Sequence, residues 1–94
     1  MITVDEIQIK AVQDVLDERA RQDAKWGVQD HLALCWLAIL AEEFGEFAKH
    51  ANEDYWRPSN CDRYAMRQEA VQVAAVALAI VECMDRTEGD RPRS

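Results

Sequence analysis

Three glutamates occupy five consecutive positions of a segment that otherwise reads as the buried face of a helix, LAEEFGEF at residues 40–47. With about 100° of rotation per residue, Glu43 falls in the middle of the apolar face of this helix. Glu42 and Glu46 project to the margin of the same face and are neighbours because they are four residues apart. The segment therefore places an acidic edge where apolar packing is expected.

A second inward-facing acid lies in the segment QEAVQVAAV, where Glu69 falls on the apolar stripe of a helix and Gln72 follows one turn later. An ionised carboxylate is costly to bury unless a positive group compensates it, and a second negative charge nearby adds to the cost. Neither stripe carries a basic residue, since Arg67 projects away from Glu69. A hard divalent cation, which prefers carboxylate oxygens, would supply the charge. The alternative is that these glutamates are solvated residues of acidic helices.

Three helices must position these acids. Thr3 followed by Glu6 has the spacing of a capping box, and apolar residues then recur with a helical period. Gly27 and Pro58 interrupt the pattern. The helices are expected from about Val4 to Ala24, from an Asp30 cap to about Asn52, and from a Ser59 cap, supported by Asp62, to about Arg86. A polar tail is expected from about residue 87, and no strand is expected.

The third helix is apolar on all sides, because eleven of the twelve residues from Ala70 to Val81 are apolar. Two other helices do not easily cover all of it, although it could simply be a core helix. The pattern favours an all-α, antiparallel bundle of three main helices that oligomerisation completes to a four-helix-type core. A homodimer or homotetramer is expected.

Composition limits the partners and the compartment. The chain of 94 residues is expected to form one domain, and its formal charge of −7 argues against general attraction to nucleic acid or to an anionic membrane. Three separated cysteines without a CxxC pair favour reduced thiols. The sequence shows neither a signal peptide nor an apolar run long enough to span a bilayer. A soluble, cytoplasmic protein is expected.

The acidic segments also carry a family resemblance. EEFGE at residues 42–46 followed by EAVQ at 69–72 resembles the paired EExxE and ExxD motifs of MazG-like, all-α nucleoside triphosphate pyrophosphohydrolases. The resemblance extends to ERARQDAKWGVQDH at 18–31, to Trp36 and to residues 68–86. It covers most of the chain, and together these segments resemble a short, single-domain branch often found on phage and mobile elements.

The resemblance implies Mg²⁺-dependent hydrolysis of a nucleoside or deoxynucleoside triphosphate to the monophosphate and pyrophosphate, with Mn²⁺ as a substitute metal, in the clearing of unwanted nucleotides. Carried over by position, Glu43, Glu46, Glu69 and Gln72 would bind metal. Glu42 would orient or deprotonate the attacking water. One departure is Gln72, which stands where the family has aspartate and offers an amide oxygen without a negative charge.

Four further residues are candidates for substrate binding. Trp26 could stack on a base or close the end of the bundle, and Lys25 could contact a phosphate or be solvated. Arg57 and Arg63 flank the second loop and could reach a triphosphate on their own or a partner subunit. An iron site at His50 is disfavoured, because it follows Glu46 by four residues rather than three. The competing functions are a non-catalytic nucleotide or metal binder and an acidic helical interaction protein.

Overall fold

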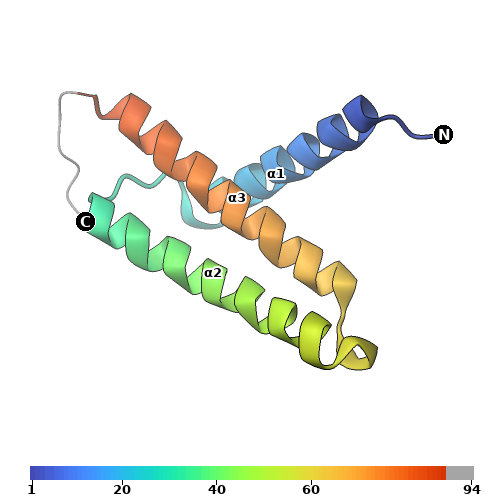
Figure 1. The fold of residues 1–94 in the computed structure, drawn as a ribbon. Helices are drawn as coiled ribbons and strands as arrows, with labels where there is room; N and C mark the ends of the chain where they lie inside the picture. Colours follow the sequence, from blue (N-terminus) through green and yellow to red (C-terminus); the bar gives the residue numbers. More distant parts are fainter. Residues whose placement is uncertain (89–94) are drawn as a thin grey trace.

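The protein is all-helical over residues 1–88, the part of the chain that the computed structural model describes. The long helices are α1 (Val4–Trp26), α2 (Ala33–Trp56) and α3 (Arg63–Arg86), and the short 3₁₀ helix η1 (Pro58–Asn60) precedes α3. Helices α2 and α3 form an antiparallel hairpin, and α1 crosses it at an angle (Figure 1). Within the described residues α1 packs against α3 but not against α2. Most of the predicted polar tail lies outside the described residues.

Helix α1 begins as its sequence predicts. The Thr3 hydroxyl accepts a hydrogen bond from the Glu6 backbone N–H at 3.1 Å, as expected for an N-cap. The helix ends at Trp26 rather than at Ala24, so Trp26 belongs to its last turn. Gly27 then adopts φ 75°, a conformation that favours glycine, and its N–H donates to the Asp23 carbonyl at 2.8 Å.

The cap predicted for α2 is wrong, and of the two residues predicted for the α3 cap only Asp62 is confirmed. Leu32, rather than Asp30, is the N-cap of α2. The Asp30 carboxylate instead accepts a hydrogen bond from Arg86 at 2.7 Å. Asp62, rather than Ser59, caps α3 and accepts from the Ala65 N–H at 3.0 Å.

Helix α2 also continues past its predicted end at Asn52, as far as Trp56. Pro58 disfavours helical backbone at the residue before it, and Arg57 has left the helix with φ −142°. The helix therefore ends beside the proline, beyond its predicted end at Asn52.

The apolar core is small and lies between α2 and α3. Its buried members are Trp36, Val76, Ala79 and Cys83, with Ile39, Leu40 and Ile80 packed against them. No helix in the described part of the chain is long and apolar enough to cross a membrane. Because α1 adds little to this core, polar contacts must contribute to holding α1 in place.

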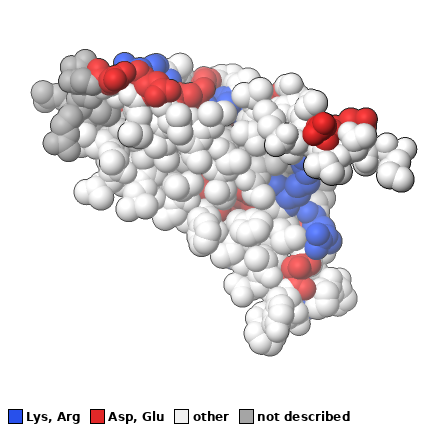
Figure 2. Space-filling model, turned by 45° about the horizontal axis from the view of Figure 1, so that its top comes forward, with Lys and Arg blue, Asp and Glu red and all other residues white. Residues whose placement is uncertain are grey.

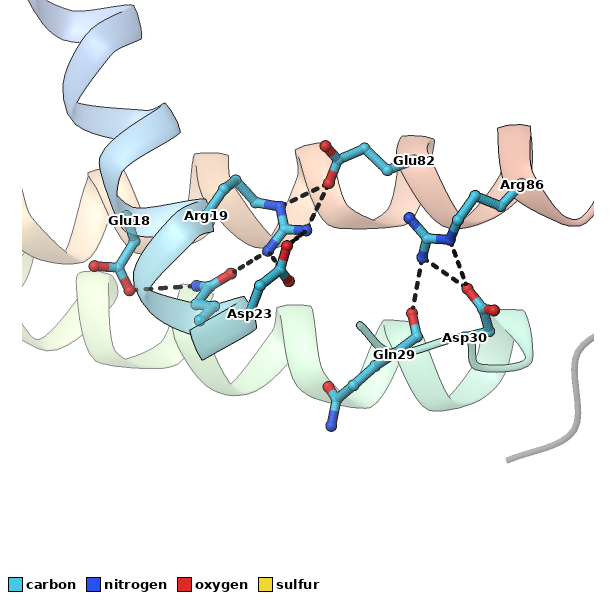
Figure 3. A network of polar contacts seen from close by, with 8 residues as sticks. Glu18, Arg19, Asp23, Gln29, Asp30, Glu82 and Arg86 are labelled. Atoms are coloured by element: carbon cyan, nitrogen blue, oxygen red, sulfur yellow. Dashed lines mark hydrogen bonds and ion pairs between the residues drawn. The ribbon is translucent and has the colours of Figure 1, made fainter. Parts of the chain in front are cut away.

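A buried arginine joins α1 to α3. Arg19 is only 8% exposed, and its Nε donates to Glu82 on α3 at 2.8 Å (Figure 3). The same guanidinium pairs with Asp23 at 3.0 Å and donates to the Gln22 amide oxygen at 3.2 Å. Hydrogen bonds to a charged group are stronger than neutral ones, so this cluster fixes the C-terminal half of α1 on α3.

Arg19→Met is expected to lower the free energy of unfolding by about 1–2 kcal/mol, because it keeps the apolar stem but removes the charged hydrogen bonds. Urea unfolding measures the change. Arg21→Met is the matched control, since Arg21 is exposed and pairs with Glu18 within the same helix. Its expected loss is below about 0.5 kcal/mol. Equal losses in the two variants would contradict a special role for Arg19.

Candidate active site

A pocket of about 440 Å³ lies where the C-terminal half of α1 crosses the α2–α3 hairpin. Its volume is within the range of roughly 300–1,000 Å³ that is usual for small-molecule sites. We group its lining residues into an α1 wall, an apolar floor from α2 and α3, and an acidic wall from the same two helices. The α1 wall includes Glu18, Arg21, Lys25 and Trp26, the floor Trp36, Ile39, Val76 and Ala79, and the acidic wall Glu42, Glu43 and Gln72.

Glu43 on α2 and Glu69 on α3 meet at the side-chain amide of Gln72. With its amide group turned toward the acids, Gln72 Nε2 donates to Glu43 Oε2 at 2.8 Å and to Glu69 Oε2 at 3.2 Å. This orientation is assigned from the hydrogen-bonding partners, because the amide oxygen in the same place would face two other oxygens. The two acids thus share one neutral neighbour, Gln72, which lines the pocket together with Glu43, whereas Glu69 is half-buried and does not line the pocket.

The Glu43 carboxyl lies in an environment that disfavours its negative charge. Burial raises the pKa of Glu43 above its ordinary value, and the charge of Glu69 raises it further. Smaller contributions in the same direction come from Glu42, Glu46 and Glu18. A cation beside Glu43 would therefore stabilise the ionised form of the whole cluster.

The other acids of the EEFGE segment have different surroundings. Glu42 lies on the pocket wall. Glu46 is half-buried, does not line the pocket, and accepts a hydrogen bond from Lys49 at 3.3 Å. Within residues 1–88, no three His, Cys, Asp or Glu side chains gather closely enough to hold a metal by themselves.

The oxygens that do gather belong to Glu43 and Glu69, and the Gln72 amide between them would offer its oxygen as a further ligand only after rotating. Mg²⁺ usually takes one or two carboxylates and completes its shell with water and substrate phosphates. The donor set therefore fits Mg²⁺ held jointly with a phosphorylated ligand, rather than an ion enclosed by protein alone.

Two of the predicted substrate contacts lie at the pocket. The Lys25 ammonium sits over the Trp26 ring, 4.6 Å from its centroid, and Trp26 is 55% exposed. Arg57 and Arg63 do not line the pocket. They lie where α2 turns into α3, and each is paired with an acid near the end of α2. Within one chain the structure does not bring these two arginines to the acidic wall.

The α1 wall contains residues that the sequence analysis did not assign. The Glu18 side chain is 13% exposed, accepts hydrogen bonds from Arg21 at 2.9 Å and lines the pocket. Gln22 lies one turn further along and also lines it. The three- and four-residue spacing of Glu18, Gln22 and Lys25 does indicate one face of a helix. The direction in which this face of α1 points, however, is set by how the helices cross, which the spacing does not show.

Comparison of the chain with protein-family models, with curated proteins and with solved structures finds no match. Function is therefore inferred from the geometry of the pocket and from the acidic motifs on its wall.

Proposed function

We propose that the protein is a Mg²⁺-dependent pyrophosphohydrolase that converts a nucleoside or deoxynucleoside triphosphate to the monophosphate and pyrophosphate. The observation that carries the proposal is the approach of Glu43 and Glu69 to one amide on the wall of a nucleotide-sized pocket. Mn²⁺ is expected to replace Mg²⁺. Clearing unwanted nucleotides would be the cellular role.

Each wall of the pocket has a part in this proposal. The metal would be held by Glu43, Glu69 and Gln72. Glu46 would become a further ligand by breaking its ion pair with Lys49, which is partly exposed and contributes little to stability. Bound Mg²⁺ would neutralise charge on the phosphates and lower the pKa of a bound water.

Glu42 would accept the proton of the water that attacks the α-phosphorus, because its carboxylate is on the pocket wall without being needed as a ligand. On the α1 wall, Trp26 would stack on the base and Lys25 would contact a phosphate. Arg57 and Arg63 would reach a substrate only across a subunit boundary.

The direct test is to incubate the purified protein with a panel of nucleoside and deoxynucleoside triphosphates and Mg²⁺, and to identify the products. Monophosphate with pyrophosphate is expected from at least one substrate. A nucleoside diphosphate with inorganic phosphate would mean cleavage between the β- and γ-phosphates, which contradicts the proposal. The absence of product from every substrate would reject the proposed enzymatic activity. Calorimetric binding without turnover would select a non-catalytic binder, which the neutral Gln72 in the acidic cluster also favours.

Trp26→Leu is expected to raise KM for the preferred nucleotide about tenfold with little change in kcat, since stacking on an aromatic ring contributes about 1–3 kcal/mol per base. Steady-state kinetics measures both constants. Trp56→Leu serves as the control, because Trp56 is equally an exposed helix-end tryptophan but lies away from the pocket. A fall in kcat at unchanged KM would argue against base stacking.

We further propose that the protein works as a homodimer or homotetramer, because one chain exposes too much surface. Its accessible area is 7180 Å². A monomer of this mass typically exposes about 5,500 Å², so the excess is roughly 1,600 Å². Stable interfaces bury about 800 Å² or more on each partner. The excess is therefore large enough for an extensive contact between copies.

The exposed apolar residues of the hairpin mark the surface for this contact. On α2 they include Leu34, Leu37, Ala41 and Phe44, and on α3 Ala70, Ala74, Ala77, Val81 and Met84. Both sets recur every three or four residues, which is the period of packed helices. In Figure 2 the charged side chains gather mainly along the margins of the view, with one recessed acidic patch near its middle. Pairing two such hairpins would complete a four-helix core.

We place this activity in the cytoplasm, where the free thiols of Cys35, Cys61 and Cys83 would stay reduced. The proposed partners are the nucleotide and further copies of the chain. Nucleic acid and membranes are not expected partners, given the charge of −7.

A further inference from the structure

The side-chain amide of Gln72 lies beside Glu43 and Glu69, where its nitrogen stabilises the two carboxylates and its oxygen would destabilise them. Its Nε2 in this place donates to one oxygen of Glu43 at 2.8 Å and one oxygen of Glu69 at 3.2 Å. Its Oε1 in the same place would gather three oxygens without a donor between them. Such a cluster is unfavourable without a cation and favourable around one.

We infer that Gln72 is an internal counter-group for the Glu43–Glu69 pair, bridging both carboxylates in the metal-free protein and turning its amide oxygen inward when metal binds. The inference rests on the proposed metal site but makes a separate claim about the protein without metal. The turn is a rotation about the last side-chain bond, whose energy profile is broad and nearly two-fold, so it requires no backbone movement.

Two consequences follow for this chain. The acidic pair is hydrogen-bonded without an ion, so the fold does not depend on metal. Metal binding must also replace the two hydrogen bonds from Gln72, which weakens affinity for the ion alone. The metal is then expected to bind together with the phosphates of the nucleotide, which supply the ligands that the protein lacks.

A carboxylate at position 72 reverses both effects. Gln72→Glu keeps the length of the side chain but replaces the donor with a third negative oxygen. The repulsion disappears only when a cation is present. Gln72→Met also keeps the length and removes both the donor and the amide oxygen without adding charge. The matched control is Gln68→Glu, which adds the same charge at an exposed position of the same helix.

The experiment measures the melting temperature of the full-length wild type and the three variants in EDTA, and Mn²⁺ affinity without nucleotide by calorimetry. In EDTA, Gln72→Glu is expected to melt at least about 5 °C below Gln68→Glu, the size of shift that about 1 kcal/mol produces in a domain of this length. Its Mn²⁺ affinity is expected to exceed that of the wild type at least about tenfold, since a charged ligand replaces a neutral one. Gln72→Met is expected to lose stability in EDTA without gaining affinity.

Equal melting temperatures and Mn²⁺ affinities for Gln72→Glu and Gln68→Glu would overturn the inference. Folding of Gln72→Glu only with Mn²⁺ would support it. If Gln72→Glu fails to fold both with and without Mn²⁺, the test is the melting temperature of Gln72→Met in EDTA. A Gln72→Met protein that melts at the same temperature as the wild type would reject the bridge. No readout involves turnover. If the wild type is inactive but the variants show the expected melting temperatures and Mn²⁺ affinities, only the proposed enzymatic activity is rejected. If the wild type is active but the variants do not differ in these two properties, only the bridge is rejected.

Discussion

Glu43→Gln is expected to reduce pyrophosphate release from the preferred nucleotide at least about 100-fold, because loss of a metal ligand or of a general base typically has effects of this size or larger. The substitution keeps the shape of the side chain and removes the charge that faces Glu69. It also removes a carboxylate whose charged form is disfavoured by burial, the first cause of the raised pKa of Glu43. The fold should therefore survive, and the loss should be specific to chemistry.

Two further readings make the Glu43 result interpretable. Mg²⁺ at a concentration above its dissociation constant is expected to raise the melting temperature of the wild type but not of Glu43→Gln, because a ligand that binds only the folded state stabilises it by mass action. Glu53→Gln is the matched control. Glu53 is a half-buried glutamate on the same helix that pairs with Arg57 and does not line the pocket. Equal activity losses in the two variants would contradict a metal role for Glu43.

Phe44→Glu is expected to weaken self-association at least about 100-fold in Kd, equivalent to about 2.7 kcal/mol. The residue is 63% exposed in one chain and lies among the apolar residues of α2 that we assign to the contact between copies. The substitution removes an aromatic ring from the interface and would bury a charge there, and both effects oppose association. Sedimentation velocity over a range of concentrations measures the change.

Val28→Glu is the control for the Phe44 experiment, because Val28 is also 63% exposed but lies in the segment between α1 and α2. It should leave the mass of the assembly unchanged. A wild-type protein that is monomeric at micromolar concentration would reject the interface. So would a Phe44→Glu protein whose association matches that of Val28→Glu.

The all-α class was predictable because the apolar period is strong and glycine and proline are few. Thr3 was a correct cap because its hydrogen bond is local, to a backbone group three residues away. Asp30 was misassigned because its partner is Arg86, which is 56 residues away in the chain. The Thr3 cap was therefore readable from local sequence, whereas the Asp30 contact, which tertiary packing sets, was not.

The candidate site divides in the same way. Helical projection turned Glu43 and Glu69 inward, and the structure places both at Gln72. Projection treats each helix separately, however, and could not show that α1 crosses the hairpin and brings Glu18 to the pocket. It also could not show that Arg57 stays at the opposite turn. Which wall faces which depends on helix crossing, and Arg19 contributes to that crossing through Glu82.

Hydrolysis of the preferred nucleotide in ¹⁸O-labelled water, followed by mass spectrometry of both products, tests the central claim most directly. If the acidic wall directs water to the α-phosphorus, one ¹⁸O atom will appear in the nucleoside monophosphate and none in pyrophosphate. Label in pyrophosphate would mean attack at the β-phosphorus, and label in inorganic phosphate would mean attack at the terminal one. Either result would contradict the account.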